Sequence, residues 1–414
     1  MKKFLWCLGA LVVVFCGSLI YYKSFGNQPS FSIEEESIKV DFIHIYGTHL
    51  NIGGDLNLDK NMDLILYDGL FKSYHINIMD GKFNLSDYLN DGIYLDNMEN
   101  GKYYMFLRET YTEDEKEKYK YYSLENTTDY KETVYYTMSN YNKKIVISSD
   151  QKYNTLILNI TTNRDKNIYD IVLDPGHGGK DPGACKGGYC ETDFTMDIAM
   201  KVKEKLEGNG IKVKLTYEKD SLSKSEKLNE YGIHGRAIIP KEVNAKYVFS
   251  IHLNSSVDSK ISGFEVYTAN NINYDFAKTL VNNVITSSNT AFSNNTKNRV
   301  FEGIYSRNFT DNDIAESLND YKKENIKAYD VTTNSNYYYM IRETGGIITG
   351  AYVDDRNEKI LPNPYVKTNV GVESYLLELG FLTSNKDREN IIKNTDKYVS
   401  GIAESIISLY NVNY

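Results

Sequence analysis

The chain contains six histidines, and two of them stand directly after apolar runs that are typical of buried strands. His177 follows "YDIVLDPG", and His252 follows "AKYVFSI". A third run of this kind, "VESYLL", leads into Glu378, while Glu191 stands at the start of a long segment with periodic apolar residues. Two imidazoles and one carboxylate form the ligand set of open catalytic zinc sites, in which water takes the fourth position. The residue types therefore predict a zinc site made by His177, Glu191 and His252.

Glu378 has the surroundings expected of a general base. Leu376, Leu377 and Leu379 flank it, and apolar surroundings raise the pKa of a carboxylate. Zinc lowers the pKa of a bound water to about 7, and a neighbouring base must then take the proton of that water. We therefore predict that Glu378 accepts this proton and later passes it to a leaving amine. The chain lacks an HExxH sequence, which excludes the common helical zinc-protease motif.

A purely structural interpretation of the same residues is also open. A histidine after a strand is often structural, and a glutamate at a helix start often serves the helix dipole. His234, in "YGIHGR", is interpreted as a loop residue near the same rim.

Alternating strands and helices are expected to position these groups. Phe194, Ile198, Val202 and Leu206 recur every four residues and predict one apolar helix face. This helix lies between two strand-like runs, "YDIVLD" and "IKVKLTYE", and the chain closes on the helical pattern "NTDKYVSGIAESIISLY". The pattern predicts an α/β fold with a mostly parallel twisted sheet and helices on both faces. In such sheets ligands gather at the carboxyl ends of the strands, where three of the four groups are expected.

The first half of the chain has a different pattern. Residues 38–165 contain short alternating runs with turn signals, such as the Asp80-Gly81 pair, and no long amphipathic helix. This pattern predicts a β-sandwich-like accessory domain. His44, His49 and His75 lie in these runs, and no cysteine or carboxylate cluster accompanies them. We interpret them as structural, and the domain as a spacer or binding module.

The N-terminal sequence indicates the compartment. "MKKFLWCLGALVVVFCGSLIYYKSFG" places two lysines before about 18 apolar residues, which is enough to span a bilayer with the following chain exported. No small-x-small site follows, so a cleaved signal peptide, which would make the protein secreted, is the second interpretation. The predicted organisation is a transmembrane signal anchor (1–26), a stalk (27–37), the β-rich domain (38–165) and a zinc-binding domain (166–414) outside the cytoplasmic membrane.

Charge and cysteine content narrow the function classes. The net charge of −9 argues against a nucleic-acid binder, since the sequence shows no basic stripe. Cys185 and Cys190 either form a disulfide that closes a small loop or remain two free thiols. A zinc knuckle would need a second Cys/His pair nearby, and the sequence has none there. Cys7 and Cys16 lie in the apolar N-terminal run and are interpreted as small apolar residues.

Four segments, "IVLDPGHGGKDPGA", "ETDFTMDIAMKVKEKLE", "FSIHLNSS" and "LLELGFLTSN", resemble in order the signature segments of the zinc-dependent N-acetylmuramoyl-L-alanine amidases. This family cuts the bond between the lactyl group of muramic acid and L-alanine in peptidoglycan. The resemblance covers roughly residues 169–412. It implies an α/β fold, one zinc ion held by His177, Glu191 and His252, and Glu378 as the catalytic residue. It also implies peptidoglycan as substrate in cell-wall remodelling or lysis, with a protein activator as a candidate partner.

Two features depart from the family pattern, the loop of residues 347–366 and the Cys185/Cys190 pair beside Glu191, and other function classes stay open. The loop of residues 347–366 is either one wall of a peptide-binding groove or a surface excursion. Arg342 is a candidate for binding a substrate carboxylate, and residues 288–336 are where a regulatory segment would be sought. The chain could also be a catalytically silent peptidoglycan-binding or scaffold module, although the complete His/Glu/His/Glu set argues against this. Zinc deacetylases and carboxypeptidases differ by releasing acetate or D-alanine.

Overall fold

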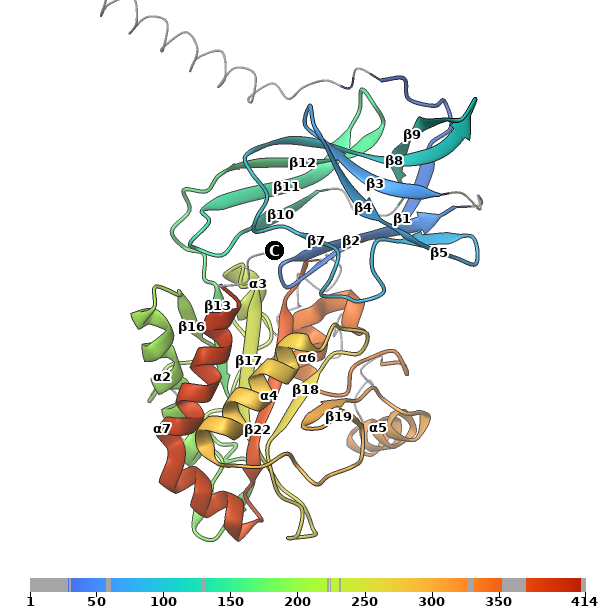
Figure 1. The fold of residues 1–414 in the computed structure, drawn as a ribbon. Helices are drawn as coiled ribbons and strands as arrows, with labels where there is room; N and C mark the ends of the chain where they lie inside the picture. Colours follow the sequence, from blue (N-terminus) through green and yellow to red (C-terminus); the bar gives the residue numbers. More distant parts are fainter. Residues whose placement is uncertain are drawn as a thin grey trace, which may run out of the picture.

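The structure, a computed structural model, describes residues 29, 31–56, 61–127, 132–221, 223, 225–230, 232–325, 331–351 and 370–410. The predicted transmembrane anchor of residues 1–26 lies outside these ranges. Within them, no helix has both the length and the apolar character needed to cross a membrane. A β-rich part, blue to green in Figure 1, is stacked on a second part that contains both helices and strands.

The β-rich part forms one large sheet. Its strands are β1 (Ile38–Tyr46), β2 (His49–Asp55), β3 (Met62–Tyr67), β4 (Phe71–His75), β5 (Asn77–Met79), β6 (Lys82–Asn84), β7 (Ile93–Tyr94), β8 (Gly101–Glu113), β9 (Lys116–Asn126), β10 (Thr133–Tyr136), β11 (Lys143–Asp150) and β12 (Thr155–Thr162). The main order is β10-β11-β12-β8-β9-β1-β2-β6-β5. As the sequence predicted, Asp80 and Gly81 turn the chain between β5 and β6, with φ of 52° and 72°.

The sandwich-like prediction for this part needs one correction. A sandwich has two separate sheets, whereas here β9 and β1 pair in parallel and join these twelve strands, together with β21 (Val370–Gly371), into a single 13-stranded sheet. The alternation of apolar residues along each strand is the same in both arrangements, because it reports only that one face is buried. The partner of an edge strand is decided by the tertiary fold.

The second part is built on a seven-stranded sheet with the order β16-β13-β17-β22-β18-β20-β19. Its elements are β13 (Ile171–Pro175), β14 (Cys185–Lys186), β15 (Tyr189–Cys190), α2 (Thr192–Gly208), β16 (Val213–Leu215), α3 (Ile239–Glu242), β17 (Tyr247–Asn254), β18 (Glu265–Thr268), α4 (Asp275–Ser288), β19 (Arg299–Phe301), β20 (Ile304–Ser306), α5 (Asp311–Glu324), α6 (Tyr339–Gly345), the 3-10 helix η1 (Gly346–Thr349), β22 (Glu373–Phe381) and α7 (Asn385–Ser408). The predicted mixed α/β fold is therefore confirmed. The strands β16, β13, β17 and β22 are parallel, whereas β18 runs antiparallel to β22.

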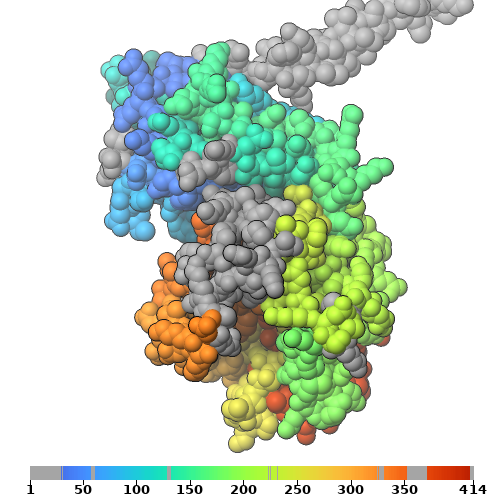
Figure 2. Space-filling view, turned by 180° about the vertical axis from the view of Figure 1, so that it is seen from behind, coloured from blue at the N-terminus to red at the C-terminus, as the bar shows by residue number. Residues whose placement is uncertain are grey.

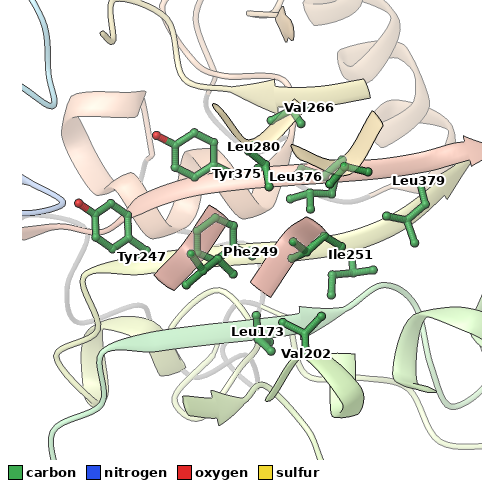
Figure 3. Close-up of a cluster of buried hydrophobic side chains, with 14 of the residues drawn as sticks. Leu173, Val202, Tyr247, Phe249, Ile251, Val266, Leu280, Tyr375, Leu376 and Leu379 are labelled. Atoms are coloured by element: carbon green, nitrogen blue, oxygen red, sulfur yellow. The ribbon is translucent and has the colours of Figure 1, made fainter. Parts of the chain in front are cut away.

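Helices cover both faces of this sheet. On one face α2, α4 and α7 enclose the main core, which Figure 3 shows with Phe249 and Tyr375 of neighbouring strands side by side. These two rings stack with centroids 5.5 Å apart. On the other face Ile239 of α3 and Met340 of α6 pack on Val248 of β17. Every residue of β22 is buried, as expected for a strand covered on both sides.

The two parts share one segment of chain. Strand β21 (Val370–Gly371) pairs with β1 in the β-rich sheet, and after one further residue the chain enters β22 of the second sheet. Tyr46 of β1 packs in the core of the second part. Its hydroxyl accepts a bond of 3.3 Å from the backbone N–H of Ser374. The amide of Asn90 donates to Glu373 at 2.8 Å. The start of β22 is therefore fixed by the β-rich part.

Candidate metal centre

His177 lies in a tight turn just beyond the end of β13. Its φ is 61°, and Gly178 and Gly179 follow with φ of 133° and 58°, a left-handed run that glycine adopts most easily. Gly176 is needed for a different reason, because a Cβ atom there would come within 2.6 Å of the His252 ring. The glycines therefore let the two imidazoles approach each other, with ring centroids 5.0 Å apart.

Glu191 lies between the two histidines. It is the N-cap residue of α2 and is 3% exposed. Its Oε2 is 3.1 Å from Nε2 of His177, and its Oε1 is 2.9 Å from Nδ1 of His252. One ligand atom of each of the three residues lies within 4.8 Å of the others. The three residues that the sequence predicted as ligands are thus close together in the structure.

These three groups are held in place by bonds from the surrounding chain. Glu191 also accepts backbone N–H bonds from Ala184 at 3.2 Å and Leu253 at 2.9 Å. Asp181 lies 2.7 Å from Nδ1 of His177, the kind of carboxylate contact that fixes the tautomer of a metal-binding histidine. Sequence reasoning missed Asp181. Its place four residues after His177 in a glycine-rich turn was the available signal.

Electrostatics at the three residues follow from their contacts. Burial alone would raise the pKa of the Glu191 carboxyl, but hydrogen bonds from His177 and His252 outweigh it and hold this pKa well below its usual range. Burial lowers the pKa of His177, yet the carboxylates of Glu191 and Asp181 outweigh burial and raise it. The carboxylate of Glu191 is thus charged and faces ring nitrogens on both sides.

The donor set fits a tetrahedral metal ion. Ligand atoms about 2.1 Å from zinc lie roughly 3.4 Å from one another in a tetrahedron. The separations of 3.1 and 2.9 Å involve different oxygens of Glu191, and ligand atoms taken one from each residue lie within 4.8 Å of one another, which is near this spacing. Imidazole and carboxylate ligands with this count suit zinc and leave one position open. The group formed by His177, Glu191 and His252 can therefore hold a metal ion.

Glu378 stands beside this group. It is the register partner of His252 in the parallel pair of β17 and β22 and is 8% exposed. Its Oε2 atom is buried and has no hydrogen-bond partner among the described residues. Burial raises the pKa of Glu378 well above its usual range, and the charges of Glu191 and Glu265 raise it further. A carboxyl group with these properties can take and keep a proton.

A buried ion pair joins the strands that lead to the centre. Arg236 donates to both carboxylate oxygens of Asp174 at 2.7 and 2.8 Å. Ser250, which shares a strand face with His252, donates to the same carboxylate at 2.6 Å, and Thr216 donates at 2.7 Å. Asp174 is the last residue but one of β13 and Ser250 lies in β17, so this carboxylate links the two strands that lead to His177 and His252.

Residues 171–408, more than half of the chain, match the profile of a protein family described as N-acetylmuramoyl-L-alanine amidase. The chain belongs to this family. The germination-specific N-acetylmuramoyl-L-alanine amidase of Bacillus subtilis is 34% identical over 103 residues, which are 23% of this chain and 44% of that protein. The N-acetylmuramoyl-L-alanine amidase AmiA of Escherichia coli is 25% identical over 247 residues, which are 58% of this chain and 76% of AmiA.

Among solved structures, the CwlD amidase from Clostridioides difficile in complex with the GerS lipoprotein is similar over 59% of this chain and 100% of that chain. The identity is 22% and the TM-score is 0.38. This amidase-family chain thus spans less than half of the B. subtilis relative but three quarters of AmiA. The β-rich part lies outside the residues that match the family.

Several other residues that the sequence singled out lie away from the centre. The suggestion that Arg342 binds a substrate carboxylate was wrong: it is 5% exposed and donates to Glu343 and to the carbonyls of Asn336 and Tyr337. His234 is an exposed loop residue beside Glu242. Burial lowers the pKa of His44 and His49 to about 4, and His75 is exposed beside Asp63. None of these four histidines joins the described metal-competent group.

Two further expectations concern segments near the centre. Cys185 and Cys190 form a disulfide that closes the hairpin of β14 and β15 directly before Glu191. Most of the loop 347–366 lies outside the described residues, so its role as a groove wall stays a prediction. In Figure 2 the face behind the view of Figure 1 shows the segments around 176–240 (green to lime) and 300–325 (orange) on opposite sides.

Proposed function

We propose that this chain hydrolyses the amide bond between N-acetylmuramic acid and L-alanine in peptidoglycan, in remodelling or lysis of the cell wall. The observation that carries the proposal is the group of His177, Glu191 and His252, with ligand atoms within 4.8 Å and Glu378 beside them, in a chain of the amidase family. A zinc ion held by these three residues would polarise the lactyl carbonyl and activate water.

The protein residues supply the proton transfers and the alignment. Glu378 has a buried oxygen without a partner among the described residues, which makes that atom available to the proton of the attacking water. Its raised pKa lets it keep the proton until the nitrogen of the departing L-alanine takes it. Asp181 holds the Nδ1 proton of His177 and so leaves Nε2 facing Glu191. Backbone N–H groups keep Glu191 from rotating.

We also propose that the chain is anchored in the membrane by its N-terminal apolar run, with the amidase part on the cell-wall side. The two leading lysines and about 18 apolar residues support this orientation. Protease treatment of intact cells without their wall should then remove the amidase part and leave the anchor. A chain found only in the culture medium would instead indicate cleavage.

The first experiment follows product release from purified peptidoglycan. Mass spectrometry should detect stem peptides with a free L-alanine N-terminus in the presence of zinc and not with a chelator. Glu378→Gln should lower turnover by about 100- to 10,000-fold while zinc content stays unchanged. Glu404→Gln, at an exposed position of α7, is the matched control and should behave as wild type.

The outcomes separate the function classes. Zinc-dependent release that requires Glu378 supports the amidase. Release of acetate or D-alanine would point to a deacetylase or a carboxypeptidase. A zinc-loaded chain that binds peptidoglycan but releases nothing would overturn the proposal in favour of a binding module.

A further inference from the structure

A second buried glutamate faces the proposed catalytic carboxyl from the neighbouring strand. Glu265 begins β18 and has no exposed surface. In the antiparallel pair of β18 and β22 it is the register partner of Glu378. Register partners on adjacent strands project to the same face of a sheet with their Cβ atoms about 5 Å apart. Glu265, Glu378 and His252 therefore form one row across three strands.

Glu265 is held entirely by neutral donors. One oxygen accepts from Asn254 at 2.8 Å and Tyr267 at 2.9 Å. The other accepts from Ser293 at 2.7 Å and Asn295 at 3.1 Å. An ionised carboxylate has about four acceptor sites, so these four donors fill it. No lysine, arginine or histidine in the described ranges forms an ion pair with it. Burying a charge without a cation is costly, which suggests that this position contributes more than stability.

One of these bonds crosses the strand that carries Glu378. The sheet order places β22 between β17 and β18, so the bond from Asn254 at the end of β17 to Glu265 on β18 passes over β22. Asn254 is only two residues beyond His252, at a point where the register of β17 and β22 shifts. The bond therefore fixes the irregular strand end next to a metal-ligand candidate. Tyr267, which also donates to Glu265, is itself held by the ring of Tyr338, with centroids 4.5 Å apart.

The charge of Glu265 also acts on the direction in which Glu378 points. Two carboxylates that face each other in a buried row repel strongly, because the dielectric screening there is weak. A fixed negative charge on the β18 side, with its acceptor sites filled, disfavours an orientation of Glu378 toward β18. The Oε2 atom of Glu378 has no hydrogen-bond partner among the described residues, so no bond holds it on the β18 side.

We propose that Glu265 is a positioning residue for Glu378, acting through its bond to Asn254 across β22 and through the negative charge that faces Glu378. This inference rests on the proposed amidase function. It predicts that loss of Glu265 lowers the rate of the chemical step while substrate binding and zinc binding persist, because Glu265 has no exposed surface and is not one of the metal-ligand candidates.

The test compares Glu265→Gln with Glu373→Gln in the purified zinc-loaded full chain. Glu373 is the matched control: it is 3% exposed and also accepts bonds from a tyrosine and an asparagine, but it lies at the other end of β22. For Glu265→Gln we expect kcat on a soluble muropeptide to fall about 10- to 100-fold, the scale of catalytic loss from a remote 1 Å misplacement. KM and zinc affinity, the latter by competition with a chromophoric chelator, should stay near wild type. Glu373→Gln should keep kcat.

Two further variants separate the bond from the charge. Asn254→Ala removes the bond across β22 and leaves the charge, whereas Glu265→Asp keeps the charge on a shorter side chain. Both should give kcat between wild type and Glu265→Gln. If Glu265→Gln shows no cooperative unfolding, Tyr267→Phe removes one donor and should still lower kcat with KM unchanged.

The inference is overturned if wild type releases free L-alanine N-termini and Glu265→Gln has the same kcat, or if Glu373→Gln loses as much. If wild type releases none, the amidase proposal itself fails. The two failures are therefore distinguishable in the same assay.

Discussion

Breaking the buried ion pair between Arg236 and Asp174 should cause a large loss in the free energy of unfolding. Asp174 is fully buried and Arg236 is 3% exposed. Burial favours the neutral carboxyl, but the guanidinium of Arg236 outweighs it and holds the pKa of Asp174 below its usual range. In Arg236→Met the carboxylate would keep only the hydroxyl donors Ser250 and Thr216. A buried charge would then lack its cation.

Removing one partner of a buried pair costs about 3–5 kcal/mol, a large share of the roughly 5–15 kcal/mol that stabilises a folded protein. Guanidinium-chloride unfolding of the metal-free chain should show this loss. The double variant Asp174→Asn/Arg236→Met should recover part of it, because no uncompensated charge remains. A loss below about 1 kcal/mol in Arg236→Met, which is the range of exposed pairs, would refute the reasoning.

The pH dependence of the same pair has a defined sign. Because the pKa of Asp174 is depressed in the folded state, its contribution to stability is present above the unfolded pKa of about 3.9 and is lost as the pH falls through the lower folded value. Wild type should therefore lose stability toward low pH more steeply than the double variant.

Further predictions concern other parts of the molecule. Burial raises the pKa of Glu373 to about 7, so its contribution to stability is present below about pH 4.5 and is lost as the pH rises through about 7. In a stability–pH profile, Glu373→Gln should remove about 3 kcal/mol of the total change in the free energy of unfolding over this range. His252→Ala should abolish stoichiometric zinc in metal analysis. Replacing Cys185 and Cys190 by serine should lower the free energy of unfolding by about 2 kcal/mol, as judged by denaturant titration. Residues 166–414 alone should be insoluble or unfold without cooperativity, because the β-rich part contributes residues to their core.

The sequence was most informative where the chemistry coincides with a strand end. His177, His252 and Glu378 each follow a short apolar run, and the three strands β13, β17 and β22 are adjacent and parallel. Carboxyl ends of adjacent parallel strands meet at one edge, so the proximity of these groups follows from the fold class alone. Glu191 was predicted from its place at the start of α2, because a helix packed on the sheet begins at the same edge.

Contacts between residues far apart in the chain could not be predicted in this way. Nothing near Asp174 indicates that Arg236, 62 residues later, binds it. Glu265 lies in a short alternating run that reads the same for a parallel or an antiparallel strand, so its place opposite Glu378 depends on the direction of β18. Arg342 precedes the strand that carries Glu378, which suggested a place near the substrate. In the structure it is buried and donates to two backbone carbonyls.

Two buried glutamates, Glu373 and Glu378, lie near opposite ends of strand β22 and have different surroundings. At its start Glu373 binds Asn90 of the β-rich part, and the preceding strand β21 belongs to the β-rich sheet. Near its end Glu378 is faced by Glu265, whose bond to Asn254 crosses the strand. The segment from β21 to β22 thus contributes a strand to each of the two sheets. A β-rich part that served only as a tether would not need this connection. The β-rich part therefore fixes the start of the strand, whereas the row of Glu265 lies beside the part of the strand that carries the proposed base.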